Sequence, residues 1–208
     1  MPPVDSNKTP NTLDCLVVGV GGQGVVLASR LIAAASMASG AFVRTAETIG
    51  MSQRGGSVAS HVRVAPSADE LPSSLICRAG ADLVLSFEPG EAIRAFSQLK
   101  PDGALVCANR PIAAAVTGVS CDLAAQTEWL QAHVRKGRFL MVDAGLLERE
   151  GLNPKSLNVL LLGAAIGLGA LPFGEQQLRQ AMEELMRPKL IPMNVKALEL
   201  GMSLTKKG

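Results

Sequence analysis

Apolar residues along this chain gather in short continuous runs that alternate with longer segments of mixed character. A run of about four to eight apolar residues between turn residues predicts a buried strand, and LDCLVV at 13–18 is such a run. A longer segment with apolar residues three or four apart, such as Leu178, Met182 and Leu185, predicts an amphipathic helix. Strands are expected at 13–18, 41–46, 58–64, 81–86, 104–108 and 138–143, and helices at 24–39, 89–99, 123–134, 156–169, 175–186 and 194–204.

The order of these segments predicts the class of fold. Strands alternate with helices throughout, which is typical of a mainly parallel sheet with helices on both faces. We therefore expect a three-layer, Rossmann-like α/β fold. Apolar and polar residues alternate at 58–64, so we expect that strand to be half exposed. Residues 1–12 are polar and contain prolines, so we expect a disordered leader, followed by a single domain over 13–208.

The most apolar stretch of the chain, 159–173, is too short to cross a membrane. It has 15 residues and is interrupted by three glycines, whereas a spanning helix needs about 20 apolar residues. We interpret it as a buried helix. Gly163 and Gly167 form a G-x-x-x-G pair on this helix, a pattern that favours close packing in the core over a contact between subunits.

Composition excludes several classes of function. The chain has 208 residues, of which 48% are hydrophobic and 18% charged, as is typical of a folded protein with a substantial core. Its net charge of +2 supplies no strong field for nucleic acid or for an acidic membrane. With five Phe, one Trp and no Tyr, a surface that stacks bases on aromatic rings is not expected.

The cysteine content argues against a metal cluster held by this chain alone. Cys15, Cys77, Cys107 and Cys121 are widely spaced and include no C-x-x-C pair, and the chain has only two histidines. Cys15 and Cys107 lie in apolar runs, so we expect buried thiols, which suit a reducing cytosol. The polar first residues carry no visible secretory signal, and we expect a cytoplasmic protein without a membrane span.

A glycine-rich turn is expected between the first strand and the first helix. The segment GVGGQG matches the dinucleotide-binding pattern G-x-G-x-x-G. Glycines permit a tight turn, and the free N–H groups at a helix N-terminus attract anions. Three interpretations stay open, namely tight packing alone, contact with an anion or coenzyme, and a nicotinamide site. The candidate residues are Gly19, Gly21, Gly22, Gln23 and Gly24.

A second polar and glycine-rich loop is expected at 47–57, after the second strand. Because ligands of α/β sheets bind at the carboxyl ends of strands, we expect this loop and the glycine turn to line one crevice. A guanidinium beside bare glycine backbone suits a carboxylate, a phosphate or a partner's acidic side chain. The alternative is a loop whose glycines serve only its own conformation. The candidate residues are Glu47, Met51, Ser52, Gln53, Arg54, Gly55 and Gly56.

Two other polar residues carry weaker signals. His61 lies on the alternating strand, and we expect a surface or half-buried histidine that forms hydrogen bonds. Asp143 ends a strand, so it could face the crevice, although capping a helix that starts near Leu146 is the favoured use.

Taken together, three segments of the chain resemble a known family. GVGGQGV at 19–25 and ETIGMSQRGGSV at 47–58 are similar to the gamma-type domain of 2-oxoacid:ferredoxin (or flavodoxin) oxidoreductases. The form GMSQRGG resembles most closely the beta subunit of indolepyruvate oxidoreductases. NVKALELG at 194–201 resembles the N-x-x-A-x-x-x-G helix at the end of these domains. The resemblance covers nearly the whole chain beyond residue 12.

This resemblance implies a subunit of an enzyme that oxidatively decarboxylates a 2-oxoacid, such as indolepyruvate or another aryl pyruvate. It implies that coenzyme A takes the acyl group and that ferredoxin takes the electrons. Thiamine diphosphate, magnesium and iron–sulfur clusters are implied on a larger catalytic partner, while this chain holds no cofactor alone and is inactive alone. The sequence agrees, because it has no cysteine cluster and no G-D-G segment followed by Asn-Asn.

Two alternatives remain at the level of sequence. A stand-alone NAD(P)-dependent oxidoreductase would place Glu47, 23 residues past Gly24, on a ribose, although the chain has no Tyr for a proton relay. A scaffold module would use both glycine-rich segments without contacting any ligand.

Overall fold

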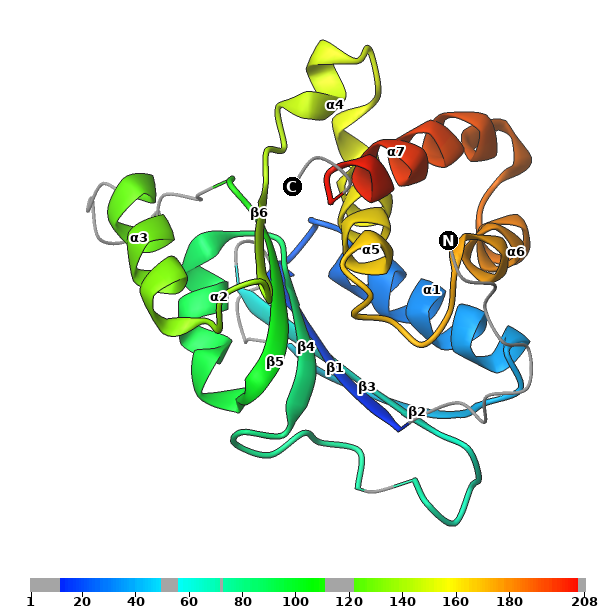
Figure 1. Ribbon diagram of the computed structural model, residues 1–208. Helices are drawn as coiled ribbons and strands as arrows, with labels where there is room; N and C mark the ends of the chain where they lie inside the picture. The colour runs from blue at the N-terminus through cyan, green and yellow to red at the C-terminus, as the bar shows by residue number, and fades with distance from the viewer. Residues whose placement is uncertain (1–11, 50–55, 72, 111–121, 206–208) are drawn as a thin grey trace.

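The computed structural model describes residues 12–49, 56–71, 73–110 and 122–205. Its strands pair into one sheet, and its helices lie on the two faces of that sheet (Figure 1). The strands are β1 (Leu13–Val20), β2 (Phe42–Ile49), β3 (Ser57–Ala65), β4 (Ala81–Ser86), β5 (Leu99–Ala108) and β6 (Phe139–Val142). The helices are α1 (Val25–Ala38), α2 (Pro89–Ala95), α3 (Leu123–His133), α4 (Leu146–Arg149), α5 (Leu157–Gly167), α6 (Glu175–Leu185) and α7 (Ile191–Ser203).

The sheet is mixed, with one reversed strand among those described. Its order is β2-β3-β1-β4-β5-β6, so β2 and β6 lie at the two edges. β1, β4, β5 and β6 pair in parallel, whereas β3 is antiparallel to both β1 and β2. β2 therefore runs in the same direction as β1. This arrangement confirms the expected α/β sheet, with β3 inserted against the common direction.

Two separate apolar layers hold the helices to the sheet. α1, α5, α6 and α7 lie on one face, and α2 and α3 lie on the other (Figure 1). Leu160, Leu161 and Leu162 of α5 are fully buried, which confirms the buried helix expected from the apolar stretch. No helix among the described residues is long and apolar enough to cross a membrane.

Glycines let α5 and α7 approach each other closely. A Cβ placed on Gly163 would lie 2.3 Å from the carbonyl oxygen of Leu198, and one on Gly201 would lie 2.2 Å from the carbonyl oxygen of Leu160. Real Cβ atoms do not approach backbone this closely, so both positions require glycine. The G-x-x-x-G pair therefore packs within the core of this chain, as the sequence favoured.

The expectation that the third strand is half exposed is wrong. β3 lies between β1 and β2, and its side chains His61 and Arg63 are buried together with their hydrogen-bond partners. His61 is 4% exposed, and its Nδ1 atom accepts a 3.1 Å hydrogen bond from the N–H of Ile76. Arg63 donates to both carboxylate oxygens of Asp14 over 2.6 Å each, and to the carbonyl oxygen of Ser73. Polar residues with buried partners thus imitate the alternation of a half-exposed strand.

Two expected loops are partly strand. β2 continues to Ile49, because its pairing with β3 extends to Val58, so Glu47 is a strand residue and does not open a loop. Residues 100–103, between the helix expected at 89–99 and the strand expected at 104–108, also belong to β5, whose register changes from Ala81 opposite Leu99 to Leu83 opposite Ala104. Glycine is needed at 103, since a Cβ there would lie 2.8 Å from the carbonyl oxygen of Ala81.

Candidate functional site

The carboxyl ends of β1 and β4 mark the place where this fold is expected to bind ligands. These two strands are parallel neighbours. The chain leaves β1 into α1 on one face of the sheet and leaves β4 into α2 on the other face (Figure 1). Such a reversal opens a crevice at the carboxyl edge of an α/β sheet, and ligands bind there in many such folds.

The glycine turn after β1 is closed by the side chain of Gln23. The Oε1 atom of Gln23 accepts a 2.6 Å hydrogen bond from the N–H of Val20, and the N–H of Gln23 donates to the carbonyl oxygen of Val20 over 3.1 Å. A Cβ on Gly19 would lie 2.6 Å from Gln23 Oε1 and 2.9 Å from Cβ of Phe87. Gly19 and Gln23 therefore serve the tight packing that was one interpretation of the motif.

The other glycines of the turn shape the entry into α1. Gly22 and Gly24 have φ angles of +92° and +96°, in the region that glycine adopts without strain. Gly24 is the N-cap residue of α1, and no side chain caps this helix end. The first N–H groups of the helix, from Val25 onward, consequently lack a partner within the helix. The turn can thus present backbone donors to an anion.

One backbone hydrogen bond joins the two glycine-rich segments, and the crevice that they are expected to line together stays a prediction. The N–H of Gly21 donates a 3.0 Å hydrogen bond to the carbonyl oxygen of Gly56. Directly after Gly56, the hydroxyl of Ser57 donates a 2.5 Å hydrogen bond to Oε2 of Glu91, whose Oε1 lies 3.2 Å from Nε of Arg94. Met51, Ser52, Gln53, Arg54 and Gly55 lie outside the described residues, so their expected roles stay predictions.

Glu47 lies apart from the glycine turn. It lies in β2, where it pairs with Ser60 of β3. Together with Arg30 and Glu184 it lines a pocket of about 420 Å³ between α1, β2 and α6. No residue of the glycine turn lines this pocket. The acid that a nicotinamide site would need on a ribose is therefore not brought to the turn.

The N-terminus of α2, on the same edge, already has an acceptor. The carboxylate of Glu88 accepts hydrogen bonds from the N–H groups of Gly90, over 3.2 Å, and of Glu91, over 2.8 Å. Glu88 is 6% exposed. Because this carboxylate occupies the free backbone donors of α2, an anion that binds at this edge would use α1 instead.

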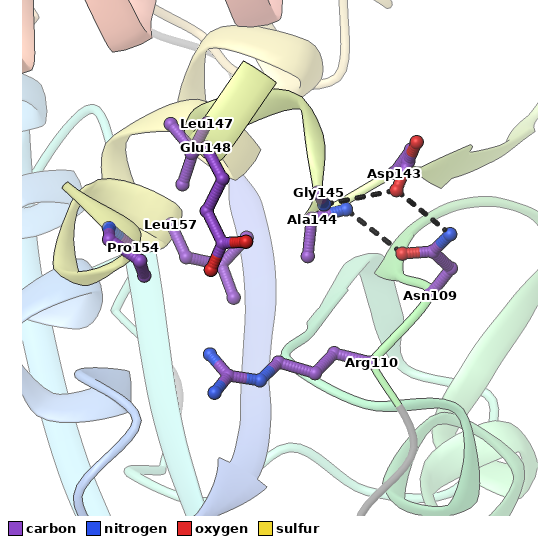
Figure 2. A pocket seen from close by; sticks show the side chains of 9 residues that line it. All are labelled: Asn109, Arg110, Asp143, Ala144, Gly145, Leu147, Glu148, Pro154 and Leu157. Carbon is purple, nitrogen blue, oxygen red and sulfur yellow. Dashed lines mark hydrogen bonds between the residues drawn. The ribbon is translucent and has the colours of Figure 1, made fainter. Parts of the chain in front are cut away.

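A second pocket, of about 320 Å³, opens where β5 and β6 end (Figure 2). Asn109 joins the two strand ends, because its Oδ1 accepts from the N–H of Ala144 over 2.9 Å and its Nδ2 donates to Asp143 over 3.2 Å. The lining residues are Asn109, Arg110, Asp143, Ala144, Gly145, Leu147, Glu148, Pro154 and Leu157.

Opposite charges face each other across this second pocket. The side chains of Arg110 and Glu148 both point into the hollow (Figure 2). Neither forms a hydrogen bond or ion pair with a residue that the structure describes. Leu147 and Leu157 supply an apolar wall. The pocket can therefore accept a group that is apolar in its body and charged at its end.

Asp143 is held in the wall of this pocket and does not cap α4 through its side chain. Its carboxylate accepts from Arg149 over 2.5 Å and from the N–H of Gly145 over 3.0 Å. The hydrogen bond from Arg149, followed by those from Gly145 and Asn109, holds the pKa of Asp143 below its usual value. The expectation that the Asp143 side chain caps a helix near Leu146 is thus wrong. The pocket that Asp143 lines includes no residue of the glycine turn, so its facing the expected crevice is not supported either.

Arg110, Asn109 and Glu148 were missed as site residues. One signal was present, since Asn109 and Arg110 directly follow a strand that the sequence predicted, and ligand-binding residues of α/β sheets lie at such positions. Glu148 gave no comparable signal, because only the packing of α4 above the strand ends brings it to the pocket.

The described residues do not form a metal site. No three His, Cys, Asp or Glu side chains in the described part of the chain gather as ligands. Cys15 and Cys107 are buried, as the sequence predicted, and burial, with nearby carboxylates adding to it, raises the pKa of both thiols well above the usual value. Such thiols are poor metal ligands, since the ligand is the thiolate.

Comparisons with known proteins agree on one family. The family model described as pyruvate ferredoxin/flavodoxin oxidoreductase matches residues 14–204. The indolepyruvate oxidoreductase subunit IorB of Archaeoglobus fulgidus is 34% identical over 191 residues, which cover 91% of this chain and 93% of that protein.

Solved structures share the fold at lower sequence identity. The gamma subunit of a keto/oxoacid ferredoxin oxidoreductase from Geobacter sulfurreducens matches with a TM-score of 0.66 and 17% identity, over 94% of this chain and 99% of the other. The 2-oxoglutarate:ferredoxin oxidoreductase of Magnetococcus marinus, with 2-oxoglutarate, coenzyme A and succinyl-CoA bound, matches with a TM-score of 0.66 and 21% identity, over 94% of this chain and 31% of that longer chain.

Proposed function

The chain belongs to the pyruvate ferredoxin/flavodoxin oxidoreductase family, and from this premise we propose that it is the small, IorB-type subunit of an indolepyruvate:ferredoxin oxidoreductase. The complex would decarboxylate indolepyruvate or another aryl pyruvate, transfer the acyl group to coenzyme A and pass the electrons to ferredoxin. The observation that carries the proposal is the 34% identity to subunit IorB across nearly the full length of both chains.

We propose that the redox cofactors lie on a larger partner subunit. The donor set of the described residues does not fit an iron–sulfur cluster, because Cys15 and Cys107 are buried and no ligand group gathers around Cys77. We propose the same position for thiamine diphosphate and magnesium, as the resemblance to this family implies. Coenzyme A as co-substrate is supported by its presence in the related 2-oxoglutarate:ferredoxin oxidoreductase.

Within the complex, we propose that residues 13–208 act as one domain whose glycine-rich edge contacts the coenzyme or the partner subunit. The hydrogen bond between Gly21 and Gly56 supports this, because it joins the two segments close to the start of α1. Ser57 and Glu91 then fix the point at which the loop returns to the sheet. Arg54 is the residue proposed to contact a phosphate or a carboxylate.

The proposal is tested by isolating the native complex. The chain is captured from its own cells under anaerobic conditions, and the eluate is assayed for thiamine diphosphate, iron and viologen reduction driven by 2-oxoacids. A larger subunit with both cofactors and with the highest activity on indolepyruvate is expected. Isolation of the chain without a partner or 2-oxoacid-dependent activity would contradict the proposal.

The role of the loop is tested with Arg54→Ala in the co-expressed complex. A raised KM for coenzyme A, or a complex that dissociates more readily, is expected. Arg30→Ala is the matched control, because Arg30 lines the pocket beside Glu47 and lies away from the glycine turn. Unchanged kinetics with coenzyme A in a complex of unchanged stability would contradict the role proposed for Arg54.

A further inference from the structure

The pocket at the ends of β5 and β6 has a frame that hydrogen bonds hold in place. The N–H of Asn109 donates to the carbonyl oxygen of Val142 over 2.9 Å, and its Oδ1 atom accepts from the N–H of Ala144 over 2.9 Å. Its Nδ2 group donates to Asp143 over 3.2 Å. Asn109 thus ties the end of β5 to the segment between β6 and α4, which fixes the two walls of the pocket relative to each other (Figure 2).

Two opposite charges in this frame are open to a ligand. Arg110 follows β5 and Glu148 belongs to α4, and both side chains point into the hollow (Figure 2). Neither forms a hydrogen bond or ion pair with a described residue. The carboxylate of Asp143 is already matched, because it accepts from Arg149 over 2.5 Å and from the N–H of Gly145 over 3.0 Å. It therefore does not draw Arg110 away from the hollow.

The rest of the pocket offers apolar surface and enough room for a small molecule. Ala144, Leu147, Pro154 and Leu157 line it beside the two charges. Its volume of about 320 Å³ lies within the range of small-ligand sites, about 300–1,000 Å³. No described lining residue belongs to the glycine turn or to the loop at 47–57. The pocket is therefore separate from the edge for which contact with a coenzyme is proposed.

We infer that this pocket binds a free α-amino acid with an apolar side chain. The guanidinium of Arg110 holds the α-carboxylate, because its paired donors match the two oxygens of a carboxylate. The carboxylate of Glu148 accepts from the α-ammonium group. The side chain of the amino acid lies against the apolar wall that includes Leu147 and Leu157.

The two charges together select a ligand that carries both signs. An apolar carboxylate without an amino group would be attracted by Arg110 but repelled by Glu148, and an apolar amine would meet the reverse. The pocket therefore favours an amino acid over the 2-oxoacid with the same side chain, because an oxo group carries no positive charge. The inference thus goes beyond the proposed function, whose substrate is the 2-oxoacid.

The inference is tested by calorimetric titration of the full chain with L-phenylalanine, 3-phenylpropionate and 2-phenylethylamine. The second ligand lacks the amino group and the third lacks the carboxylate. L-phenylalanine is expected to bind saturably, and each analogue at least tenfold more weakly. Absence of L-phenylalanine binding up to tens of millimolar, or equal affinity for either analogue, would overturn the inference. These titrations use the chain alone, so their outcome is independent of isolating a catalytic partner.

Two-dimensional ¹⁵N NMR during the same titration locates the ligand. L-phenylalanine is expected to shift the backbone amides of Ala144 and Gly145 and the side-chain amide of Asn109, which lie in the wall of the pocket. Saturable shifts confined to other parts of the chain would overturn the inference.

Exchanging each charge for an amide tests the two roles separately. Glu148→Gln is expected to weaken L-phenylalanine binding at least tenfold and to strengthen 3-phenylpropionate binding, because the repulsion is removed. Arg110→Gln is expected to weaken L-phenylalanine and to strengthen 2-phenylethylamine. A misfolded variant would lose every ligand, so the gain for one analogue distinguishes lost recognition from lost folding. Unchanged affinity for all three ligands in both variants would overturn the inference.

Glu150→Gln is the matched control for these variants. Glu150 is exposed and lies two positions beyond Glu148, but it does not line the pocket. Its replacement removes the same charge from the same segment, and wild-type affinity for all three ligands is expected. A loss of L-phenylalanine binding as large as that of Glu148→Gln would mean that general surface charge governs the affinity, which would overturn the inference.

Discussion

The backbones of Gly163 and Leu198 are in direct contact across the crossing of α5 and α7. A Cβ on Gly163 would lie 2.3 Å from the carbonyl oxygen of Leu198 and 3.2 Å from Cα of Gly201. Both obstructing groups belong to the backbone, so no change of rotamer can relieve them. The crossing depends on the absence of a side chain at this position.

Gly163→Ala is expected to lower the free energy of unfolding by about 1–3 kcal/mol, because the added methyl group forces the two helices apart. Urea unfolding followed by circular dichroism measures the change. Gly21→Ala is the matched control, since a Cβ there would lie 3.8 Å from the nearest described atom. If both variants unfold at the same urea concentration, the close crossing does not limit stability.

Removing the guanidinium of Arg63 is expected to lower the free energy of unfolding more than Gly163→Ala does. Asp14 and Arg63 form an ion pair whose side chains are 10% and 9% exposed, and Arg63 also donates to the carbonyl oxygens of Ser73 and Leu75. Arg63→Met would leave a buried carboxylate unpaired, which costs about 3–5 kcal/mol.

The double variant Asp14→Leu/Arg63→Met distinguishes the cost of losing the ion pair from the cost of leaving the Asp14 carboxylate buried and unpaired. Because no carboxylate remains buried, it is expected to recover a large part of the lost stability in the same denaturant assay. A double variant as unstable as Arg63→Met alone would mean that the contacts of Arg63 with the backbone at 73–75, and not the charge on Asp14, dominate.

Stability is expected to depend on pH through His61. Burial, and secondly the nearby charge of Arg63, lowers the pKa of His61 below its ordinary value of 6.5. The unfolded chain therefore takes up a proton near pH 6.5 that the folded chain resists. The free energy of unfolding should fall as the pH drops below about 6.5, and level off below the folded pKa.

Thermal unfolding between pH 7.5 and 5 measures this dependence. His61→Gln keeps an acceptor for the N–H of Ile76 without the titrating ring, so its curve should be flatter over this range. His133→Gln is the matched control, because His133 is exposed. Equal slopes for wild type and His61→Gln would assign the pH dependence to other groups.

Cysteine labelling is expected to distinguish exposed from buried thiols. Cys77 is exposed, whereas burial raises the pKa of Cys15 and Cys107, so both stay protonated and shielded at neutral pH. Iodoacetamide treatment of the native chain, followed by peptide mass mapping, should show modification at Cys77 but not at Cys15 or Cys107. Rapid modification of Cys15 before unfolding would contradict the buried position of β1.

Local patterns in the sequence were sufficient to predict the framework and the first turn. The run before Gly19 and the small residues after Gly24 specify a strand and a helix by short-range preferences alone. Gly40 follows the C-cap residue of α1 with a φ of +83°, the conformation in which glycine commonly ends a helix. The meeting of Gly21 with Gly56 followed from a general rule about strand ends.

Features that depend on long-range pairing could not be predicted in this way. The direction of β3 has no local signal, and the polar side chain of Arg63 is explained only by Asp14, which lies 49 residues earlier. Glu47 belongs to a strand because Ser60 pairs with it. Asn158 lies at the start of a run of apolar residues, and only the packing of α5 against the glycine turn brings it beside Gly24.

The position of β2 at the edge of the sheet has a consequence for handling the protein. No described strand pairs with its outer side, and FVRTAETI is rich in residues that favour strands and contains no proline. Arg44 and Glu47 are an odd number of positions apart, so they place one charge on each face. Such charges discourage edge-to-edge aggregation. Replacing both Arg44 and Glu47 by uncharged residues should therefore reduce the solubility of the protein more strongly than it lowers the melting temperature.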